Sequence, residues 1–271
     1  MAPRSPTPRR PRTHVRRRKR QPLRGSVRWG RRLLPSARTR RRLWRSYRRA
    51  APSVQIATAV AVLVVAWAVV NGIYQALRKP TELFFPVSGV LFKTPAETWD
   101  AYASIFRRHS TTAITAEFLA ALAQVEASGN PIARTYWRWS WTLHPLEVYR
   151  PASSAVGMYQ ITDARYQDAK RLCIHKHVAT DDCWFNFLYM RTVPSHAVEM
   201  TAAFLDLAVQ RRALKSATLQ QKQDLAALIH LCGERARLGT RRCGEHDAQV
   251  YLAQVNAMKR LFARLAKEEE L

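Results

Sequence analysis

The first fifty residues of this 271-residue chain contain no aspartate or glutamate. They hold 20 of the 45 lysine and arginine residues, six prolines and little apolar periodicity. A segment of this composition cannot bury enough apolar surface to fold alone, so residues 1–52 are predicted to form a disordered, basic cytoplasmic tail. The remaining residues carry 25 basic and 19 acidic side chains, so the formal net charge of +26 says little about the folded part.

Strand-like alternation of apolar and polar residues is also scarce, and no internal repeat is evident. We therefore expect one all-α domain of roughly 175 residues, which is enough for a single core. Capping boxes, in which a threonine is followed three residues later by Glu or Gln, mark the predicted helix starts at Thr94 and Thr218. The predicted helices cover residues 94–108, 113–128, 162–174, 195–213, 219–232 and 246–268.

Charged residues are absent from Ile56 to Leu77, a run of 22 almost wholly apolar residues. About 20 such residues span the hydrocarbon core of a bilayer, so contact with the membrane is expected through residues 56–77. A cleavable signal peptide has a shorter apolar core and a small-residue cleavage site. Residues 53–78 are therefore predicted to be a single-pass transmembrane signal anchor.

The positive-inside rule predicts a cytoplasmic amino terminus, because the basic charges are concentrated before the apolar run. The chain beyond it then lies on the other side of the membrane. Pro86 and Gly89 interrupt any regular pattern just after the run, so residues 79–93 are predicted to be a linker. The folded domain is expected to occupy residues 94–271.

Cysteine is scarce, and all four cysteines lie beyond the apolar run. This distribution agrees with an oxidising compartment such as a bacterial periplasm. Disulfides are the favoured interpretation. Pairing Cys173 with Cys183 and Cys232 with Cys243 would close two short loops, although four cysteines allow three connectivities. Free thiols and a metal site within residues 173–183 are the alternatives, although the Cys-x-His-x-His pattern there lacks a usual structural-zinc spacing. We predict neither a metal nor a cofactor.

One glutamate near the end of a predicted helix is the candidate catalytic residue. Apolar residues recur at helical spacing as far as Val125, so the helix has a core face and Glu126 lies beside it. A carboxyl group partly withdrawn from water has a raised pKa and can act as an acid near neutral pH. Glu126 is therefore a candidate general acid.

Four short segments follow one another in a specific order. Glu126 is followed by Ala-Ser-Gly-Asn-Pro, residues 157–161 read Gly-Met-Tyr-Gln-Ile, residues 229–233 read Ile-His-Leu-Cys-Gly, and residues 251–255 read Tyr-Leu-Ala-Gln-Val. The ordered set resembles the lytic transglycosylase family, the SLT-like enzymes related to goose lysozyme. The family patterns are Glu-Ser-x-x-Asn-Pro, Gly-Leu-Met-Gln, Ala-Tyr-Asn-Ala-Gly and Tyr-Val-x-x-Val. The third segment departs most, since it lacks both the tyrosine and the asparagine.

The resemblance implies a lysozyme-like helical domain in a membrane-anchored peptidoglycan lytic transglycosylase of the bacterial inner membrane. Its partners would be peptidoglycan glycan strands in the periplasm. In such enzymes the glutamate, here Glu126, protonates the leaving oxygen of the MurNAc-GlcNAc bond. The ionised glutamate then takes the proton from the muramic acid C6 hydroxyl, which attacks and leaves a 1,6-anhydroMurNAc end. The N-acetyl group of the substrate takes the place of a carboxylate nucleophile.

Candidate substrate contacts come from the remaining segments. A glycine permits close approach of backbone and substrate, and a glutamine offers both a donor and an acceptor to sugar groups. The candidates are Gln160, Gly157, Met158, Tyr159, Ser154, His230 and Tyr251. Alternatives stay open: a structural hydrogen bond for Gln160, a satisfied helix histidine for His230, and packing, which is favoured, for Tyr251.

An aromatic insert separates the first two segments. It contains Tyr136, Trp137, Trp139, Trp141 and Tyr149. Aromatic faces stack on sugar rings, so a glycan-binding flap is one interpretation. Burial in the core is the favoured one, since tryptophan buries a large area wherever it falls.

The basic tail has three interpretations: contact with anionic lipid, binding of nucleic acid, or control of topology alone. Twenty basic residues exceed what topology needs, so anionic lipid or envelope machinery is the expected partner. Nucleic acid is disfavoured, because prolines interrupt any recognition helix and few aromatic residues accompany the charges.

Two rival functions remain. One is a non-catalytic, peptidoglycan-binding scaffold of an envelope or secretion machine, which the altered third segment favours. The other is a lysozyme-type hydrolase, for which Glu147 and Asp163 are the nearby candidates for a second carboxylate.

Overall fold

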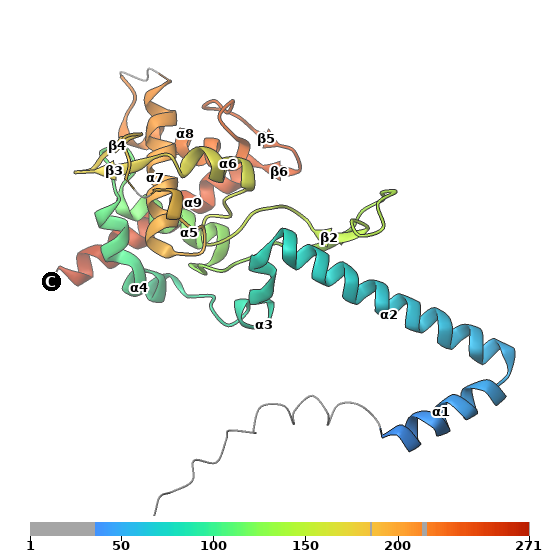
Figure 1. Cartoon of the computed structure of the whole chain (residues 1–271). Helices are drawn as coiled ribbons and strands as arrows, with labels where there is room; N and C mark the ends of the chain where they lie inside the picture. Colours follow the sequence, from blue (N-terminus) through green and yellow to red (C-terminus); the bar gives the residue numbers. More distant parts are fainter. Residues whose placement is uncertain (1–35, 185, 213–215, 271) are drawn as a thin grey trace, which may run out of the picture. The chain divides into compact units, whose positions relative to one another are not determined.

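The computed structural model describes residues 36–184, 186–212 and 216–270. The secondary structure is 59% helix and 8% strand, so the all-α prediction is confirmed at this level. The chain divides after Val65 into two compact units, and each is described by itself (Figure 1). The disorder predicted for residues 1–35 lies outside the described residues.

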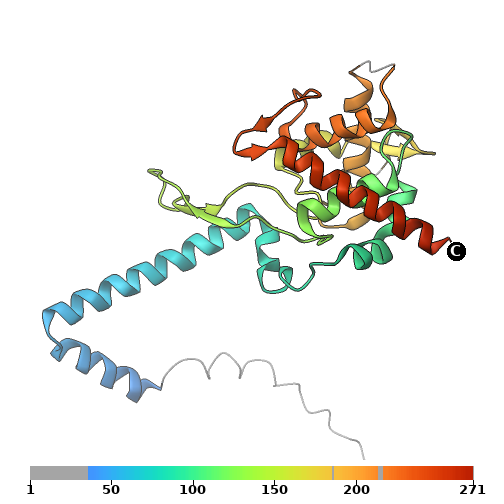
Figure 2. The same cartoon turned by 180° about the vertical axis from the view of Figure 1, so that it is seen from behind.

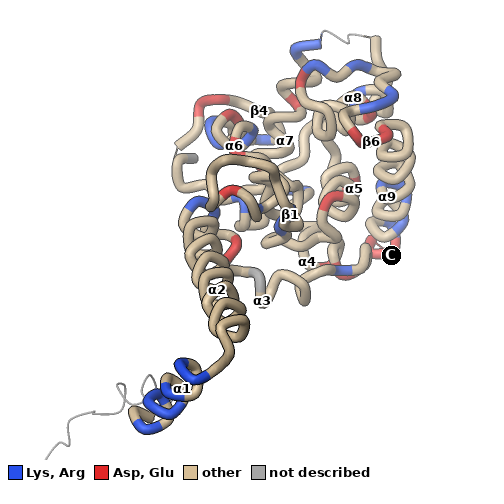
Figure 3. The backbone as a smooth tube through the Cα atoms, turned by 90° about the vertical axis from the view of Figure 1, so that its right-hand side faces the viewer, with Lys and Arg blue, Asp and Glu red and all other residues tan. Residues whose placement is uncertain are grey.

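The first unit contains helix α1, Ala37–Arg49, and the beginning of helix α2, Pro52–Arg78. Ser36 caps α1 by accepting a hydrogen bond from the Thr39 amide at 3.2 Å. Lys and Arg residues line the helix (Figure 3), while Trp44 stacks on Tyr47. The prediction of disorder is therefore wrong for α1, whose alanine, leucine and arginine residues favour a helix and whose sequence contains no proline.

Helix α2 contains 27 residues and is long and apolar enough to cross a membrane. Among its residues only Asn71 and Gln75 are buried by protein. Length and composition thus agree with the predicted single span, which ends in Arg78.

The segment after α2, predicted to be an irregular linker, contains the 3-10 helix η2, Pro80–Phe84, and the short helix α3, Phe85–Ser88. The buried carboxylate of Glu82 organises it. Lys79 and Arg134 pair with this carboxylate at 3.2 and 3.0 Å, and the Trp137 indole donates to it at 2.8 Å. These contacts hold the segment against strand β1, Trp137–Trp139, and the residues just before it.

The core of the second unit is built from five helices: α4, Pro95–Arg108; α5, Ala116–Ala127; α7, Pro194–Gln210; α8, Leu219–Cys232; and α9, Ala248–Glu269. Helix α5 packs against α4 and α9, while α7 packs against α8 (Figure 2). Both predicted capping boxes are present, at Thr94 and Thr218. Helix α5 begins later than predicted because the side chain of Thr115 caps it by accepting from the Phe118 amide.

Three short antiparallel strand pairs occur in the described residues. They are β1, Trp137–Trp139, with β2, Tyr149–Pro151; β3, Cys173–His175, with β4, Val178–Thr180; and β5, Arg242–Cys243, with β6, His246–Asp247. Helix α6, Asp163–Ala169, is shorter than predicted because the chain turns into β3. Lys176 and His177 both adopt positive φ, which suits the two-residue turn between β3 and β4.

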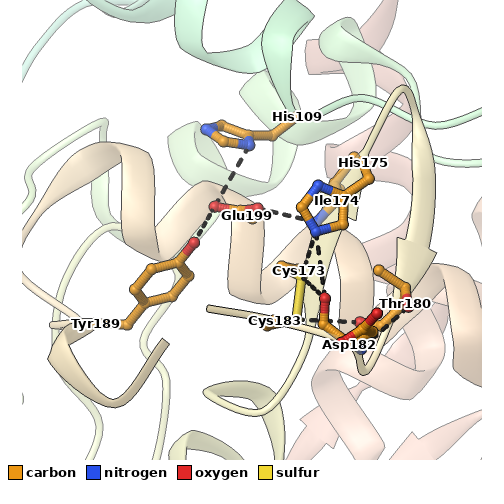
Figure 4. Close-up of a disulfide and its surroundings, with 9 residues drawn as sticks. All are labelled: His109, Cys173, Ile174, His175, Thr180, Asp182, Cys183, Tyr189 and Glu199. Carbon is orange, nitrogen blue, oxygen red and sulfur yellow. Dashed lines mark hydrogen bonds and ion pairs between the residues drawn. A yellow bond between two sulfur atoms is a disulfide. The ribbon is translucent and has the colours of Figure 1, made fainter. Parts of the chain in front are cut away.

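Disulfides join Cys173 to Cys183 and Cys232 to Cys243, so the prediction of disulfides is confirmed and the structure decides between the three possible connectivities. The first disulfide lies at the base of the β3–β4 hairpin (Figure 4). Because both sulfurs are oxidised, the cluster at 173–183 offers no thiolate to a metal, and the alternative zinc interpretation is wrong.

A buried glutamate connects this hairpin to the core. Glu199 on α7 accepts hydrogen bonds from the Ile174 amide at 2.9 Å and from the Tyr189 hydroxyl at 2.6 Å. His109 lies 3.7 Å from the same carboxylate, and burial lowers the pKa of this histidine (Figure 4). One carboxylate on α7 thus contacts Ile174, Tyr189 and His109, and both of its oxygens are engaged.

Gly157 is required by a close approach between two backbones. Its φ is +81°, and a Cβ atom there would lie 2.3 Å from the Arg191 carbonyl oxygen. We predict that Gly157→Ala lowers the free energy of unfolding by about 2–4 kcal/mol, from overpacking and left-handed strain together. Chemical denaturation of the full chain in detergent measures this loss.

Gly239→Ala is the matched control, because Gly239 has φ +85° and its Cβ would meet nothing within 4 Å. It carries the backbone strain alone, about 1–2 kcal/mol. Equal losses in the two variants would show that the contact with Arg191 is unimportant.

Candidate active site

Glu126 lies in the last turn of α5, at a helix end that the following residues fix. Ser128 and Gly129 adopt left-handed conformations with φ of 48° and 64°. A Cβ on Gly129 would lie 2.3 Å from the Thr98 hydroxyl, so only glycine fits. Asn130 is buried and donates to the Ser88 carbonyl at 2.6 Å. The segment Ala-Ser-Gly-Asn-Pro that follows Glu126 therefore ends α5.

Tyr251, in the first turns of α9, donates its hydroxyl to Oε1 of Glu126 at 2.6 Å. The Glu126 side chain is 17% exposed, and Tyr251 is buried. The sequence interpretation favoured packing for Tyr251. The structure shows packing and, in addition, a direct hydrogen bond to the candidate catalytic carboxyl.

His230, at the end of α8, lies on the same carboxyl oxygen. Its Nε2 is 3.5 Å from Oε1 of Glu126, and the histidine side chain is only 5% exposed. Burial, with a smaller contribution from the Arg165 charge, lowers the pKa of His230 to about 3. His230 is therefore neutral at physiological pH and contributes no positive charge to the carboxyl.

Arg165 on α6 holds the end of α8 in place. Its guanidinium donates to the carbonyl oxygens of Ile229 and His230 at 3.1 and 3.3 Å, and it lies 4.7 Å from the centre of the Phe204 ring. The last carbonyl groups of a helix have no partner within the helix, so a cation there is stabilising. Sequence reasoning missed Arg165, because nothing in its local pattern distinguishes it from a surface arginine.

Burial raises the pKa of the Glu126 carboxyl. The Tyr251 hydrogen bond opposes this increase, as do the positive charges of Arg165 and His246. In the described part of the chain both polar contacts of Glu126 use Oε1, which leaves Oε2 without a protein partner. The site thus contains a partly exposed carboxyl group with one oxygen unpartnered among the described residues, and its raised pKa means that it keeps its proton to higher pH.

The structure corrects three predicted substrate contacts. Met158 and Tyr159 are fully buried, so neither presents a surface to a glycan. Tyr159 donates its hydroxyl to the Leu119 carbonyl at 3.1 Å, and its ring packs edge-on to His230. Gly157 is buried and approaches the Arg191 backbone, not a ligand. These residues support the site from within the core.

Gln160 and Ser154 make local hydrogen bonds. The Gln160 amide donates to the Gly157 carbonyl at 2.8 Å, and its own backbone has a positive φ of 46°. The structural interpretation therefore describes Gln160 better than a dedicated sugar contact. The Ser154 hydroxyl accepts from the Asp163 amide at 3.0 Å, at the start of α6. Both side chains remain half-buried, so a contact with substrate stays a prediction.

The aromatic insert forms the β1–β2 hairpin. Trp139 is 69% exposed and Trp141 is fully exposed. The favoured prediction of core burial is therefore wrong for these two tryptophans.

Comparison of the chain with protein-family models, with curated proteins and with solved structures found no match.

Tyr251→Phe is expected to raise the pKa of Glu126 further, because it removes a hydrogen bond that favours the ionised carboxyl. A hydrogen bond to a charged group contributes about 1.5–3 kcal/mol. Carboxyl-carbon NMR of the full chain in detergent measures the pKa. Tyr102→Phe, on α4, is the control and leaves it unchanged; a fall in the Tyr251→Phe variant would contradict the assigned geometry.

His230 makes the fold sensitive to acid. Its pKa is about 3 in the folded state and near 6.5 in the unfolded chain. Between these values the unfolded chain binds the extra proton, so stability falls as pH falls, by up to about 1.4 kcal/mol per pH unit from this residue. In His230→Asn this dependence is absent.

Chemical denaturation of both proteins at pH 7.5 and pH 5 measures the effect. The stability advantage of the native chain over His230→Asn should be smaller at pH 5. A pH-independent difference would mean that His230 is not held neutral.

Proposed function

We propose that this protein is a membrane-anchored peptidoglycan lytic transglycosylase with a lysozyme-like helical domain. The observation that supports it best is the state of Glu126: a mostly buried carboxyl with a raised pKa, one oxygen bonded to Tyr251 and the other without a partner among the residues that the structure describes. Such a group can deliver a proton to a glycosidic oxygen at neutral pH. The ordered resemblance of the sequence supplies the substrate class.

In the proposed mechanism Glu126 first acts as the acid. Protonated Oε2 donates to the leaving oxygen of the MurNAc-GlcNAc bond, while Tyr251 stabilises the negative charge that develops on the carboxylate. The ionised carboxylate then accepts the proton of the C6 hydroxyl, which closes the anhydro ring. The Tyr251 hydrogen bond stabilises the ionised carboxylate, whereas burial favours the protonated carboxyl group. These opposing effects let one residue serve in both steps.

The environment of the other carboxylates favours transglycosylation over hydrolysis. A lysozyme-type mechanism requires a second carboxylate at the cleaved bond. Glu147 is paired with Arg78 at 2.6 Å and with Arg150 at 3.2 Å. Asp163 is paired with Arg191 at 2.8 Å. Among the described residues neither contacts Glu126, so each carboxylate is engaged elsewhere.

The altered third segment does not leave the site open. His230 fills the place where the family has a tyrosine, and Arg165 holds the backbone around it. The carboxyl group therefore keeps a fixed surrounding without the Tyr-Asn pair, which favours an active enzyme over a non-catalytic scaffold.

The proposed location is the bacterial inner membrane, with α2 as the span and the domain in the periplasm. Two disulfides agree with an oxidising compartment. Helix α1, rich in arginine and carrying exposed Leu43 and Trp44, suits contact with anionic lipid on the cytoplasmic side. An envelope machine as partner stays a prediction.

The decisive experiment is mass spectrometry of peptidoglycan treated with the full chain in detergent. We expect products with 1,6-anhydroMurNAc ends from the native protein and a loss of at least about 100-fold in Glu126→Gln. Glu117→Gln is the matched control, because Glu117 lies on the same helix α5, in its first turn.

Reducing ends from the native protein would identify a hydrolase instead. Binding to peptidoglycan without any cleavage would favour the scaffold. Full activity in Glu126→Gln would contradict the assignment of the acid.

A further inference from the structure

Helix α2 is longer than a bilayer requires. Its 27 residues extend about 40 Å, whereas the hydrocarbon core is about 30 Å thick. About seven residues therefore lie outside the hydrocarbon. The buried polar residues Asn71 and Gln75 identify the end that emerges, since both lie in the last third of the helix just before Arg78.

A stripe of side chains on this end of α2 contacts the connection between β1 and β2. The Trp67 indole donates to the Pro145 carbonyl at 2.9 Å, the Asn71 amide to the Tyr149 carbonyl at 2.8 Å, and the Gln75 amide to the Leu146 carbonyl at 2.7 Å. The three residues are spaced by four, so they form one face of the helix. The insert thus lies lengthwise along α2.

Ring contacts and an ion pair follow the same face. Trp67 stacks on Trp139 at 6.1 Å, and Tyr74 stacks on His144 at 6.1 Å. Arg78 pairs with Glu147. The β1–β2 hairpin lies beside this end of α2 in both views (Figures 1 and 2).

The deepest of these contacts places the insert at the membrane surface. Trp67 precedes Asn71 by one helical turn, about 6 Å toward the centre of the span. With Asn71 just outside the hydrocarbon, Trp67 lies at the boundary between headgroups and acyl chains. A hairpin that contacts Trp67 therefore reaches this boundary. Tryptophan and tyrosine favour this boundary because an apolar ring and a polar N–H or O–H both find partners there.

The outer face of the insert suits that environment. Trp141 and Leu143 are fully exposed, and Trp139 and Tyr136 are largely exposed. Arg138, also exposed, lies between two of these aromatic residues in β1 and its flank. Exposed apolar side chains at a hairpin tip are costly in water. Leu143 has no polar group for a sugar, which favours lipid over a glycan strand.

We propose that residues 136–151 form an interfacial membrane anchor. The tip inserts Trp141 and Leu143 into the headgroup boundary of the same bilayer that α2 crosses, in the leaflet on the side of residues 79–271. The ligand is phospholipid, and the inference depends on α2 as a span, not on the proposed enzyme activity.

The test uses the full chain in phosphatidylcholine–phosphatidylglycerol vesicles, with or without lipids brominated near the headgroup end of the acyl chain. Subtracting the emission of Trp141→Phe from that of the native chain isolates Trp141. Trp184→Phe is the matched control, because Trp184 is also largely exposed but lies near the β3–β4 hairpin. Trp141→Phe changes a fully exposed side chain, so the fold should be retained; a thermal scan checks this.

We expect brominated lipid to quench the Trp141 signal and aqueous iodide to leave it, with the reverse pattern for Trp184. Equal iodide quenching of both tryptophans, without quenching by brominated lipid, would overturn the proposal. Protection of Trp141 from iodide by added peptidoglycan fragments, again without lipid quenching, would also overturn it and assign the insert to glycan binding.

Discussion

A carboxyl group at the end of an almost wholly apolar helix is the constraint on which the candidate site depends. Helix α5 is buried along nearly its whole length, so Glu126 is only partly hydrated. Partial burial destabilises the charged form, and the fold compensates with one donor, Tyr251 of α9. That hydrogen bond lies within the packed interface of α5 and α9 and leaves the second carboxyl oxygen without a partner among the described residues.

A comparison of Glu199 with Glu126 shows why surroundings decide function. Glu199 receives an amide and a tyrosine hydroxyl and lies beside His109, so both of its oxygens are engaged. A carboxylate saturated in this way connects α7, α4 and the β3–β4 hairpin and has no capacity for a ligand. Glu126 has the same chemistry but one bonded oxygen. Burial alone therefore does not distinguish a structural carboxylate from a candidate acid. The distinguishing feature is whether one carboxyl oxygen lacks a hydrogen-bond partner among the described residues.

Short-range sequence patterns predicted the structural features that depend on neighbouring residues. Both capping boxes and most helix bounds follow from short-range sequence patterns, whereas the pairing of the four cysteines did not. Tertiary packing decided the rest: it buried Met158 and Tyr159, which a motif alone had placed at the surface, and it brought Arg165 to the end of α8. Composition also misled for α1, because net charge predicts disorder while helix propensity and capping act over a few residues.

Long-range contacts between α2 and the aromatic insert explain why the segment after α2 is not a flexible tether. Lys79 donates to the carbonyl oxygens of Ser153 and Ala155, close to the turn at Gly157, and pairs with Glu82. A linker of about fifteen free residues would let the domain move widely relative to α2. Here short side-chain contacts fix the end of α2 against the β1–β2 hairpin and the loop that follows β2. The position of the loop around Gly157 relative to the end of α2 is therefore set by these contacts, in which the polar residues Asn71 and Gln75 of α2 take part.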